Sequence, residues 1–327
     1  MSEKILKLTI PKGSLQEAVS SFFERAGLKL NFASSRDYKP SVNDSEIYIK
    51  MLRPQEIPNY LIGEDEFDLG ISGIDWVKET NADVEVILDL EIGTVRIVFC
   101  VPAIWENINS LGDALTEFSN KNKILRISTE YLTLSLNYIK SNATYKKLYG
   151  EKAPLVITPW KTWGENENVK IFLSFGATEA KPPEEVDAII DNTETGSTIR
   201  ANNLKIVEVL DTSNAVLIAN KYALKDDWKK EKIKDLKVLL MGVIEASKKL
   251  HIFVNVHEDN LNQLLVSLPA LKRPTISKLA GENAEGWYAI NTIIKKEEFL
   301  SLIPVLRKLT QGLVVHEPRQ ILPFEQI

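Results

Sequence analysis

Short apolar runs alternate with amphipathic segments along the first two thirds of the chain. The runs end in glycine, proline or polar residues, which is typical of strands in an α/β domain with a mainly parallel sheet. Strands are predicted at 5–10, 47–52, 67–74, 84–90, 96–101, 124–128, 155–158, 171–175, 186–190, 205–210 and 215–219. Helices are predicted at 14–26, 54–62, 112–120 and 132–142, and another from Trp76, with Asp75 as its cap. Ligands of such domains lie at the carboxyl ends of the strands.

The alternation restarts after residue 103, which predicts a second α/β lobe. The strands at 205–210 and 215–219 are expected to rejoin the first lobe, so that the chain crosses twice and the lobes form a hinged, periplasmic-binding-protein-like cleft. The expected boundaries are 1–100 plus 205–226 for lobe I and 101–204 for lobe II. The polar section 145–170 is interpreted as a surface excursion. Its Trp160 and Trp163 have the chemistry to stack on a base, but packing is the commoner role of such aromatics.

The pattern changes after Asn220. A charged stretch at 222–237 leads into a helix that is predicted to continue through Ala246. Beyond it the order is strand, helix, strand, strand, helix, strand, at 250–257, 259–268, 275–279, 286–294, 296–308 and 313–318. This order predicts a ferredoxin-like β-α-β-β-α-β domain, with 227–327 as its expected extent. A separate domain of this kind more often binds or regulates than reacts.

Composition restricts the class of protein. The 327 residues are 44% hydrophobic, which is ample for two or three domains, and no apolar run approaches the ~20 residues of a membrane span. The amino terminus has no basic segment followed by an apolar one, so we expect a cytoplasmic location. The single cysteine, Cys100, excludes an intramolecular disulfide and a thiolate metal cluster. The net charge of −5 gives no indication of nucleic-acid binding, so an anionic ligand must be met by local cations.

The stretch at 186–204, VDAIIDNTETGSTIRANNL, carries the most distinctive candidate chemistry. An apolar strand ends at Asp191, and four hydroxyl side chains and Gly196 follow before a segment that is able to begin a helix. Phosphate binding needs converging backbone N–H groups, hydroxyl donors and a glycine that closes the loop. An ordinary turn capped by serine or threonine gives the same pattern, so both interpretations stay open here.

Several basic and small residues lie at other strand ends. Lys12 and Gly13 follow the first predicted strand, Arg53 ends another, and Ser72 and Arg36 also lie near element ends. Such residues face the ligand edge of an α/β sheet, although isolated surface cations are more often solvated. All three histidines, His251, His257 and His316, occur in the last quarter. A histidine base, a Ser-His-Asp triad or a histidine-ligated metal is therefore not expected near Asp191.

Taken together, these segments resemble the ATP phosphoribosyltransferase family in its long form, and the resemblance runs nearly end to end. The segments that carry it are TIPKGSL at 9–15, LRPQEIPNYL at 52–61, FDLGISGIDWV at 67–77, LDLEIGTVRIV at 88–98, DAIIDNTETGSTIRANNL at 187–204, GVIEASK at 242–248 and LPALKRPTISKLAG at 268–281. Three places depart from the family pattern. Ser14 stands where arginine is usual, residues 130–132 read Glu-Tyr-Leu instead of a Ser-Tyr-Pro type, and 180–186 is about one residue short.

The resemblance implies a division of the site between two substrates. It assigns phosphoribosyl pyrophosphate to Asp191, Asn192, Thr193, Glu194, Thr195, Gly196, Ser197 and Thr198. It assigns ATP to Lys12, Gly13, Arg36, Arg53, Ser72 and Glu179. Arg36, Arg53, Lys12 and Asp191 are the expected catalytic residues. Mg²⁺ is expected to be carried mainly by the substrate, with Glu179 as a candidate ligand.

The implied reaction transfers the 5-phosphoribosyl group to N1 of ATP and releases pyrophosphate, as the first step of histidine biosynthesis. The resemblance also implies histidine as a feedback inhibitor bound by the C-terminal domain, and a homo-oligomer, either a dimer or a hexamer. Two other classes remain as alternatives: a non-enzymatic two-lobed solute-binding or nucleotide-sensing protein, and a family member with altered catalysis. The first alternative predicts an export signal, which the amino terminus does not show.

Overall fold

The computed structural model describes residues 4–34, 36–64, 66–269, 274–281 and 284–324. The described chain forms two compact units, one of residues 5–18 and 47–226 and the other of residues 4, 19–46 and 227–324. Helix α1 (Ser14–Arg25) begins in the first unit and ends in the second. The first unit contains two β-sheets, and the second contains the C-terminal sheet.

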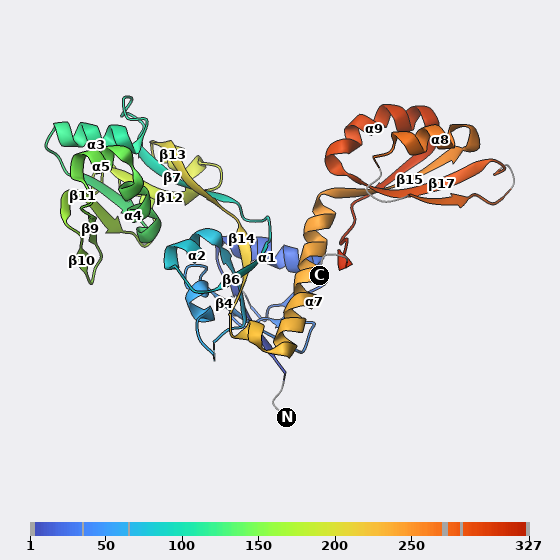
Figure 1. Ribbon diagram of the computed structural model, residues 1–327, viewed down its shortest axis with the longest axis horizontal. Helices are drawn as coiled ribbons and strands as arrows, with labels where there is room; N and C mark the ends of the chain where they lie inside the picture. The colour runs from blue at the N-terminus through green and yellow to red at the C-terminus, as the bar shows by residue number, and fades with distance from the viewer. Residues whose placement is uncertain (1–3, 35, 65, 270–273, 282–283, 325–327) are drawn as a thin grey trace. The chain divides into compact units, whose positions relative to one another are not determined.

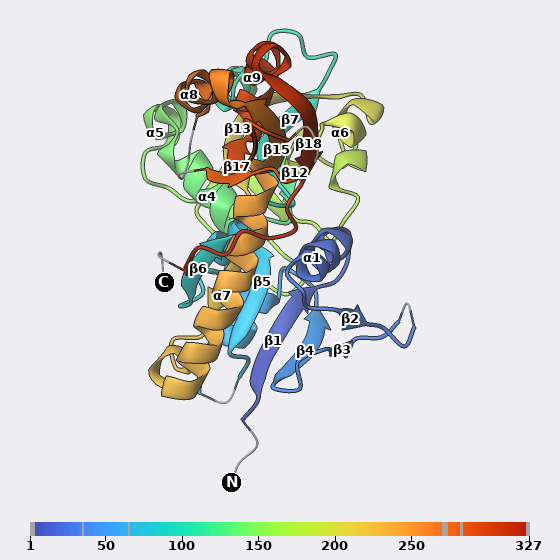
Figure 2. The same ribbon diagram turned by 90° about the vertical axis from the view of Figure 1, so that its right-hand side faces the viewer.

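The first sheet has five strands in the order β4-β1-β5-β14-β6. Their bounds are β1 Leu6–Pro11, β4 Ile47–Leu52, β5 Leu69–Gly73, β6 Glu85–Asp89 and β14 Ala215–Ala219. Strand β1 lies between β4 and β5 and is parallel to both, as Figure 2 shows. Strand β14 is antiparallel to its neighbours β5 and β6. The parallel register brings the carboxyl ends of β1 and β4 together, so the residues that follow them are neighbours.

The second sheet has seven strands in the order β10-β9-β11-β8-β12-β7-β13. Their bounds are β7 Val95–Pro102, β8 Leu125–Thr129, β9 Pro154–Ile157, β10 Thr162–Trp163, β11 Asn166–Leu173, β12 Ala188–Thr193 and β13 Leu204–Ser213. Helices α3 (Leu111–Asn120), α4 (Leu132–Ser141) and α5 (Ala143–Tyr149) belong to this lobe (Figure 1). The helix α6 (Ser197–Ala201) packs through Ile199 on the other face of the sheet.

The alternation of side chains along β7 explains why this sheet is covered on both faces. Ile97 and Phe99 join the core under α3, α4 and α5, whereas Val98 and Cys100 join the smaller core under α6. Successive side chains of a strand point to opposite faces, so a continuously apolar run indicates a strand buried on both sides. Cys100 is fully buried and its desolvation raises the thiol pKa to about 12, which confirms its packing role.

The chain crosses twice between the two sheets, as expected, but not at the expected strands. The assignment of 96–101 and 205–210 to the first lobe is wrong, because β7 and β13 pair with each other in the second sheet. An apolar strand pattern reveals that a strand is buried, but it does not name the partner strand. Residues 145–170 are not a surface excursion either, because Tyr145, Val156 and Val169 are fully buried. They form α5 and the edge strands of the second sheet.

Two local predictions in the first lobe also need correction. Residues 54–62 contain only a short 3₁₀ helix, η1 (Ile57–Leu61). Helix α2 (Ile74–Thr80) begins two residues before Trp76, and Gly73 stands at its N-cap position. The Asp75 side chain therefore does not cap α2, and it is buried instead.

The C-terminal part of the second unit begins with helix α7 (Asp227–Ser247). It continues as β15 Lys249–His257, α8 Glu258–Ser267, β16 Thr275–Lys278, β17 Trp287–Lys295, α9 Lys296–Leu309 and β18 Thr310–His316. The four strands form an antiparallel sheet in the order β16-β17-β15-β18, and Figure 1 shows α8 and α9 on one face of it. The β-α-β-β-α-β prediction is therefore confirmed.

Four short elements complete the described chain. They are the hairpin strands β2 (Leu30–Asn31) and β3 (Ser41–Val42), and the 3₁₀ turns η2 (Thr178–Ala180) and η3 (Ala223–Lys225). None of the helices in the described ranges has a segment apolar enough to traverse a bilayer. The overall prediction of two α/β lobes followed by a ferredoxin-like domain holds.

Candidate active site

The candidate phosphate loop joins β12 to α6. Gly196 adopts φ +76° and ψ 9°, a left-handed conformation that glycine tolerates and other residues rarely adopt. A Cβ at this position would also lie 3.0 Å from the guanidinium of Arg200 and 3.3 Å from Ile206. The tight turn between strand and helix therefore depends on this glycine, as the sequence predicts.

The loop hydroxyls have divided roles. The Gly196 amide donates to Thr193 Oγ1 over 2.9 Å, and Thr193 is buried. The Ser197 amide donates to Thr195 Oγ1 over a longer 3.3 Å, and both of these residues are exposed. Thr193 thus stabilises the turn, whereas Thr195, Ser197 and the exposed Thr198 present hydroxyls to solvent. Because α6 has only five residues, its dipole adds little to anion binding at the loop.

These residues line a pocket of about 350 Å³, which we call the acidic pocket. Its lining residues are Glu179, Asp191, Asn192, Thr193, Glu194, Thr195, Ser197, Thr198 and Ile199. The structure therefore brings together all the predicted phosphoribosyl pyrophosphate residues except Gly196, which lies inside the turn, and adds Glu179 from η2. Three of the lining side chains are carboxylates and none is a cation. A polyanion that enters this pocket needs positive charge from elsewhere.

Asp191 has an unusual electrostatic environment at the end of β12. Its pKa is raised to about 7, mainly by burial and also by the negative charges of Glu179 and Glu130, against the opposing effects of the Asn192 amide and Lys181. The Asn192 amide donates to Asp191 Oδ1 over 2.8 Å. A carboxyl group with this pKa exchanges its proton near neutrality and becomes a stronger acceptor when a cation enters the pocket.

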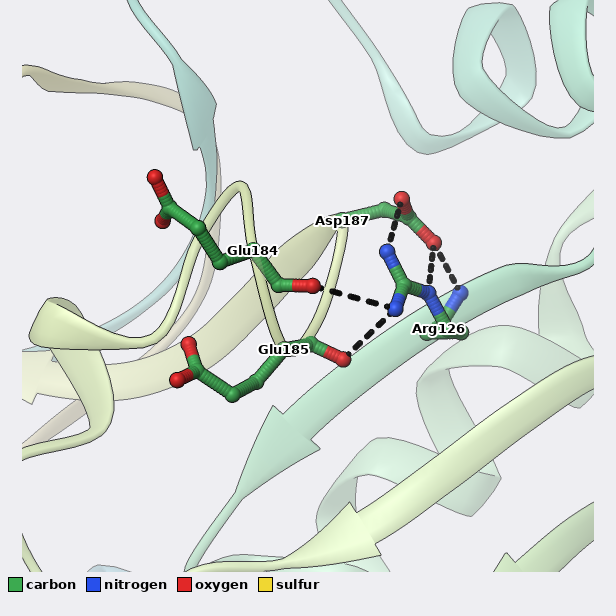
Figure 3. Close-up of polar contacts among 4 residues, drawn as sticks. All are labelled: Arg126, Glu184, Glu185 and Asp187. Atoms are coloured by element: carbon green, nitrogen blue, oxygen red, sulfur yellow. Dashed lines mark hydrogen bonds and ion pairs between the residues drawn. The ribbon is translucent and has the colours of Figure 1, made fainter.

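The segment before β12 is fixed by an arginine on the neighbouring strand β8. Arg126 forms a two-pronged ion pair with Asp187, with Nη2 and Nε each 2.9 Å from a carboxylate oxygen. Its Nη1 also donates to the backbone carbonyl oxygens of Glu185, at 2.8 Å, and Glu184, at 3.3 Å (Figure 3). The Arg126–Asp187 ion pair is partly shielded from solvent and is bidentate. Two parallel hydrogen bonds fix the relative orientation of the two side chains. This contact fixes the segment that departs from the family pattern.

A second group of predicted residues gathers at the carboxyl ends of β1, β4 and β5, and we call it the basic edge: Lys12, Gly13, Arg53 and Ser72. The Lys12 amide donates to Leu52 O over 2.8 Å, and a Cβ on Gly13 would lie 3.4 Å from Arg53 Nη1. Gly13 has φ +104°, so it too has a conformation that favours glycine. Ser72 is buried and donates to Pro54 O over 2.7 Å, so its role is to hold the segment that carries Arg53.

Arg36 lies in the other compact unit. Its backbone amide donates to Ser34 Oγ over 3.3 Å. The structure therefore does not group Arg36 with the basic edge, and its predicted role stays a prediction.

Sequence reasoning missed three residues next to the site. Arg96 on β7 lies opposite Thr193 of the loop strand, on the sheet face that also carries Asp191 and Cys100. Asp75 and Tyr131 form a buried hydrogen-bonded pair beside Asn192. The signal for Arg96 was available, because a lone arginine in an apolar strand is costly unless a ligand or partner meets it.

The acidic pocket contains carboxylates that are able to contact a metal ion. Among the described residues no group of three or more His, Cys, Asp or Glu side chains is arranged to hold a metal ion. Glu179 and Asp191 do line one pocket, and carboxylate oxygens suit Mg²⁺. Mg²⁺ usually keeps several waters and bridges one or two carboxylates to substrate phosphates. The donor set fits an ion that arrives with a phosphorylated substrate.

Family models match most of the chain. The model described as "HisG: ATP phosphoribosyltransferase" matches residues 53–242, and the one described as "HisG, C-terminal domain" matches residues 246–317. Among solved structures, a chain of the ATP phosphoribosyl transferase (HisG:HisZ) complex from Thermotoga maritima is 22% identical with a TM-score of 0.53. The match covers 72% of the present chain and 99% of that chain. At this identity the likeness shows the fold alone.

Full-length relatives agree with the family models. An ATP phosphoribosyltransferase from Pelotomaculum thermopropionicum is 37% identical over 308 residues, which cover 93% of the present chain and 94% of the relative. One from Solibacter usitatus is 38% identical over 309 residues, with coverages of 93% and 94%. The resemblance inferred from sequence motifs is confirmed. The chain belongs to the ATP phosphoribosyltransferase family and is a transferase.

Proposed function

We propose that this protein transfers the 5-phosphoribosyl group of phosphoribosyl pyrophosphate to N1 of ATP, releasing pyrophosphate. Family membership supports the first step of histidine biosynthesis as its place in metabolism. The single observation that carries the proposal is the acidic pocket, where a hydroxyl-rich turn follows β12, a strand that carries the Asp191 carboxylate two residues before its end. Hydroxyls suit a phosphate group, and carboxylates suit ribose hydroxyls.

The chemistry fits a site without a histidine base. N1 of adenine attacks with a lone pair and carries no proton, so no general base is needed at that atom. The main requirements are an in-line arrangement of the two substrates and stabilisation of the pyrophosphate leaving group. Holding two reactants in line contributes ~7 kcal/mol or more, and preorganised charges at the leaving group contribute several more.

Roles within the acidic pocket follow from exposure and geometry. The exposed hydroxyls of Thr195, Ser197 and Thr198 donate to the 5-phosphate, and Gly196 keeps the turn that presents them. Asp191 and Glu194 accept hydrogen bonds from the ribose hydroxyls. A raised pKa makes Asp191 a weaker acceptor at low pH, so binding of the ribose should strengthen as pH increases through 7.

Positive charge comes from outside the pocket. Lys12 and Arg53 of the basic edge bind the phosphates of ATP and the departing pyrophosphate. A contact of Arg36 with ATP is proposed from the family resemblance alone. Arg96 adds a cation beside the loop strand, since it lies opposite Thr193. Glu179 is the protein group suited to contact a Mg²⁺ ion, or its water, that arrives on phosphoribosyl pyrophosphate, and such an ion would supply positive charge to the leaving pyrophosphate.

The remaining expectations concern regulation and assembly. We propose that the ferredoxin-like domain binds histidine as a feedback inhibitor, that the protein acts as a homo-oligomer, dimeric or hexameric, and that it works in the cytoplasm. The match of residues 246–317 to the family's C-terminal domain supports the presence of that domain. Histidine titration of the full chain, with alanine as the control amino acid, tests the inhibition. A rate that histidine does not change contradicts it.

The proposed reaction is tested by incubating the full chain with ATP, phosphoribosyl pyrophosphate and Mg²⁺ and following the absorbance of N1-ribosylated adenine. We expect Thr198→Ala to raise the KM for phosphoribosyl pyrophosphate about tenfold, since a hydrogen bond to a charged group contributes about 1.5–3 kcal/mol. Thr116→Ala is the matched control, because the Thr116 hydroxyl bonds only within α3, to Gly112 O. Binding of both substrates without turnover would favour the sensor alternative.

A further inference from the structure

The Tyr131 hydroxyl occupies a junction between two polar side chains. It donates its proton to Asp75 Oδ2 over 2.8 Å and accepts from Asn192 Nδ2, also over 2.8 Å. Tyr131 precedes α4 in the second lobe, Asp75 lies on α2 in the first lobe, and Asn192 belongs to β12. One hydroxyl therefore connects the first lobe to the strand that leads into the candidate phosphate loop.

Asp75 extends this connection to the point where the chain returns to the first lobe. Its Oδ1 accepts from Ser213 Oγ over 2.6 Å, and its own amide donates back to Ser213 Oγ over 3.2 Å. Ser213 ends β13, immediately before the crossover into β14. The Asp75 carboxylate requires glycine at position 73, because a Cβ there would lie only 2.0 Å from Asp75 Oδ1. The carboxylate thus meets donors from two separate parts of the chain.

Burial makes the loss of any hydrogen bond in this small network costly in free energy. Tyr131 is fully buried and Asp75 is 3% exposed, so neither finds a substitute partner in water. The Tyr131 ring also stacks on Trp76 of α2, with ring centroids 4.5 Å apart. A buried donor or acceptor that loses its partner costs about 1–3 kcal/mol, so the bonds tend to form together.

A second contact holds α4 against α2 independently of the hydroxyl. The Glu79 carboxylate accepts from the amides of Thr133, at 2.9 Å, and Leu134, at 3.0 Å. The two lobes therefore remain joined when the Tyr131 hydroxyl is removed and its ring is kept. What the hydroxyl adds is the connection to Asn192, whose side chain is otherwise exposed.

We propose that Tyr131 is a positioning residue that couples the first lobe to the phosphoribosyl pyrophosphate strand. The closed Asp75–Tyr131–Asn192 chain of hydrogen bonds fixes Asn192, and with it the end of β12 where Asp191 lies. Tyr131 itself touches no substrate, so its effect falls on binding of the ribose substrate and not on the chemical step. The inference rests on the proposed function, since it takes the loop as the phosphoribosyl pyrophosphate site.

The test compares Tyr131→Phe, Asn192→Ala and the double variant in the full-length protein. Tyr131→Phe should raise the KM for phosphoribosyl pyrophosphate about tenfold and leave kcat and the KM for ATP within about twofold. Asn192→Ala removes the other end of the same bond together with a side chain that lines the acidic pocket, so it should raise this KM at least as much. The double variant should be no worse than Asn192→Ala alone, because residues that act as one unit are not additive.

Tyr138→Phe is the matched control. The Tyr138 hydroxyl also donates to a carboxylate in the second lobe, that of Glu208, and its ring packs against Phe99. It has no hydrogen bond to β12 or its loop. We expect Tyr138→Phe to lower the melting temperature. It should not raise the KM for phosphoribosyl pyrophosphate relative to the KM for ATP.

Three outcomes would overturn the inference. They are an unchanged KM for phosphoribosyl pyrophosphate in Tyr131→Phe, an equal rise in both KM values, and additive effects in the double variant. Calorimetric titration of each variant with phosphoribosyl pyrophosphate and Mg²⁺ runs alongside the rate assay. If the wild-type protein binds phosphoribosyl pyrophosphate but does not react, the proposed reaction fails while the ratio of dissociation constants still tests the coupling. If it does not bind, both fail.

Discussion

The basic edge of the first lobe and the acidic pocket of the second are built alike but carry opposite charge. Each lies at a turn that follows a strand, and each turn has a glycine of positive φ, Gly13 at +104° and Gly196 at +76°. The basic edge presents Lys12 and Arg53, whereas the pocket presents hydroxyls and three carboxylates. A strand followed by a glycine turn thus presents basic side chains in one lobe and acidic and hydroxyl side chains in the other.

This difference in charge indicates how two polyanionic substrates are distinguished. A site made only of cations would bind either substrate in either place, because charge alone does not distinguish phosphates. Carboxylates repel a bare polyanion and accept hydrogen bonds from a sugar, so under the proposed function we expect the acidic pocket to select a ligand that offers ribose hydroxyls and brings its own Mg²⁺. In this proposal the basic edge provides the attraction, and the pocket provides the selection.

The largest expected effect comes from removing charge at the basic edge. Arg53→Ala should lower kcat/KM about 100-fold or more, since a preorganised donor at developing charge contributes about 2.7–4 kcal/mol. Steady-state kinetics with each substrate varied in turn measure this effect, and Arg53→Lys should recover part of it. Arg307→Gln, on exposed α9, is the charge-matched control. If kcat/KM falls no further in Arg53→Ala than in this control, Arg53 is not part of the active site.

A smaller effect should follow from Arg96, which lies beside the acidic pocket. We expect Arg96→Gln to raise the KM for phosphoribosyl pyrophosphate about tenfold, because one charge-assisted contact to an anion is lost, at roughly 1.5–3 kcal/mol. The KM for ATP should change little. Lys221→Gln is the control, since Lys221 pairs with Asp83 at an exposed site. Equal sensitivity of both substrates to Arg96→Gln would contradict the division between the two regions.

The smallest effect concerns stability without substrates. The folded protein raises the pKa of Asp191 to about 7 from 3.8, so between these values the folded state holds a proton that the unfolded chain has released. This group therefore destabilises the fold increasingly as pH rises from about 4 to 7. Asp191→Asn should melt at the wild-type temperature near pH 4 and a few degrees above it at pH 8, while losing activity.

Asp83→Asn serves as the control for this comparison, because Asp83 is exposed and pairs with Lys221. The difference in melting temperature between Asp83→Asn and the wild-type protein should not grow between pH 4 and pH 8. Melting curves at five or six pH values are sufficient. A constant offset for Asp191→Asn across the whole range would show that Asp191 keeps an ordinary pKa in the fold.

The loop and the basic edge were predictable from sequence because their chemistry is local. Gly196, Thr193 and Asp191 are close neighbours in the chain, and a strand followed by a glycine turn determines their arrangement. The pairing of β7 with β13 was not predictable, since any two apolar strands satisfy the same pattern. The burial of Tyr145 was hidden for a similar reason, because tyrosine occurs both on surfaces and in cores.

The contacts missed from sequence all join residues far apart in the chain. Asp75 has the spacing of a helix cap, and only the fold shows that Tyr131 and Ser213 claim its oxygens instead. The strand of Arg96 was itself assigned to the first lobe and the strand of Thr193 to the second, so nothing in the sequence indicated that these two residues lie opposite each other. Long-range partners decided these roles, and neither periodicity nor short motifs contain that information.

The clamp formed by Arg126 has a consequence for which substitutions this chain tolerates before β12. Two of its bonds end on backbone carbonyl oxygens, those of Glu184 and Glu185, which every amino acid provides. Only Asp187 is held through its side chain. We therefore expect substitutions of Glu184 and Glu185 to leave the start of β12 anchored, whereas Lys181 in the same segment makes side-chain bonds of its own to Ser128 and Ser174. The anchor itself depends on keeping Arg126 and Asp187 together.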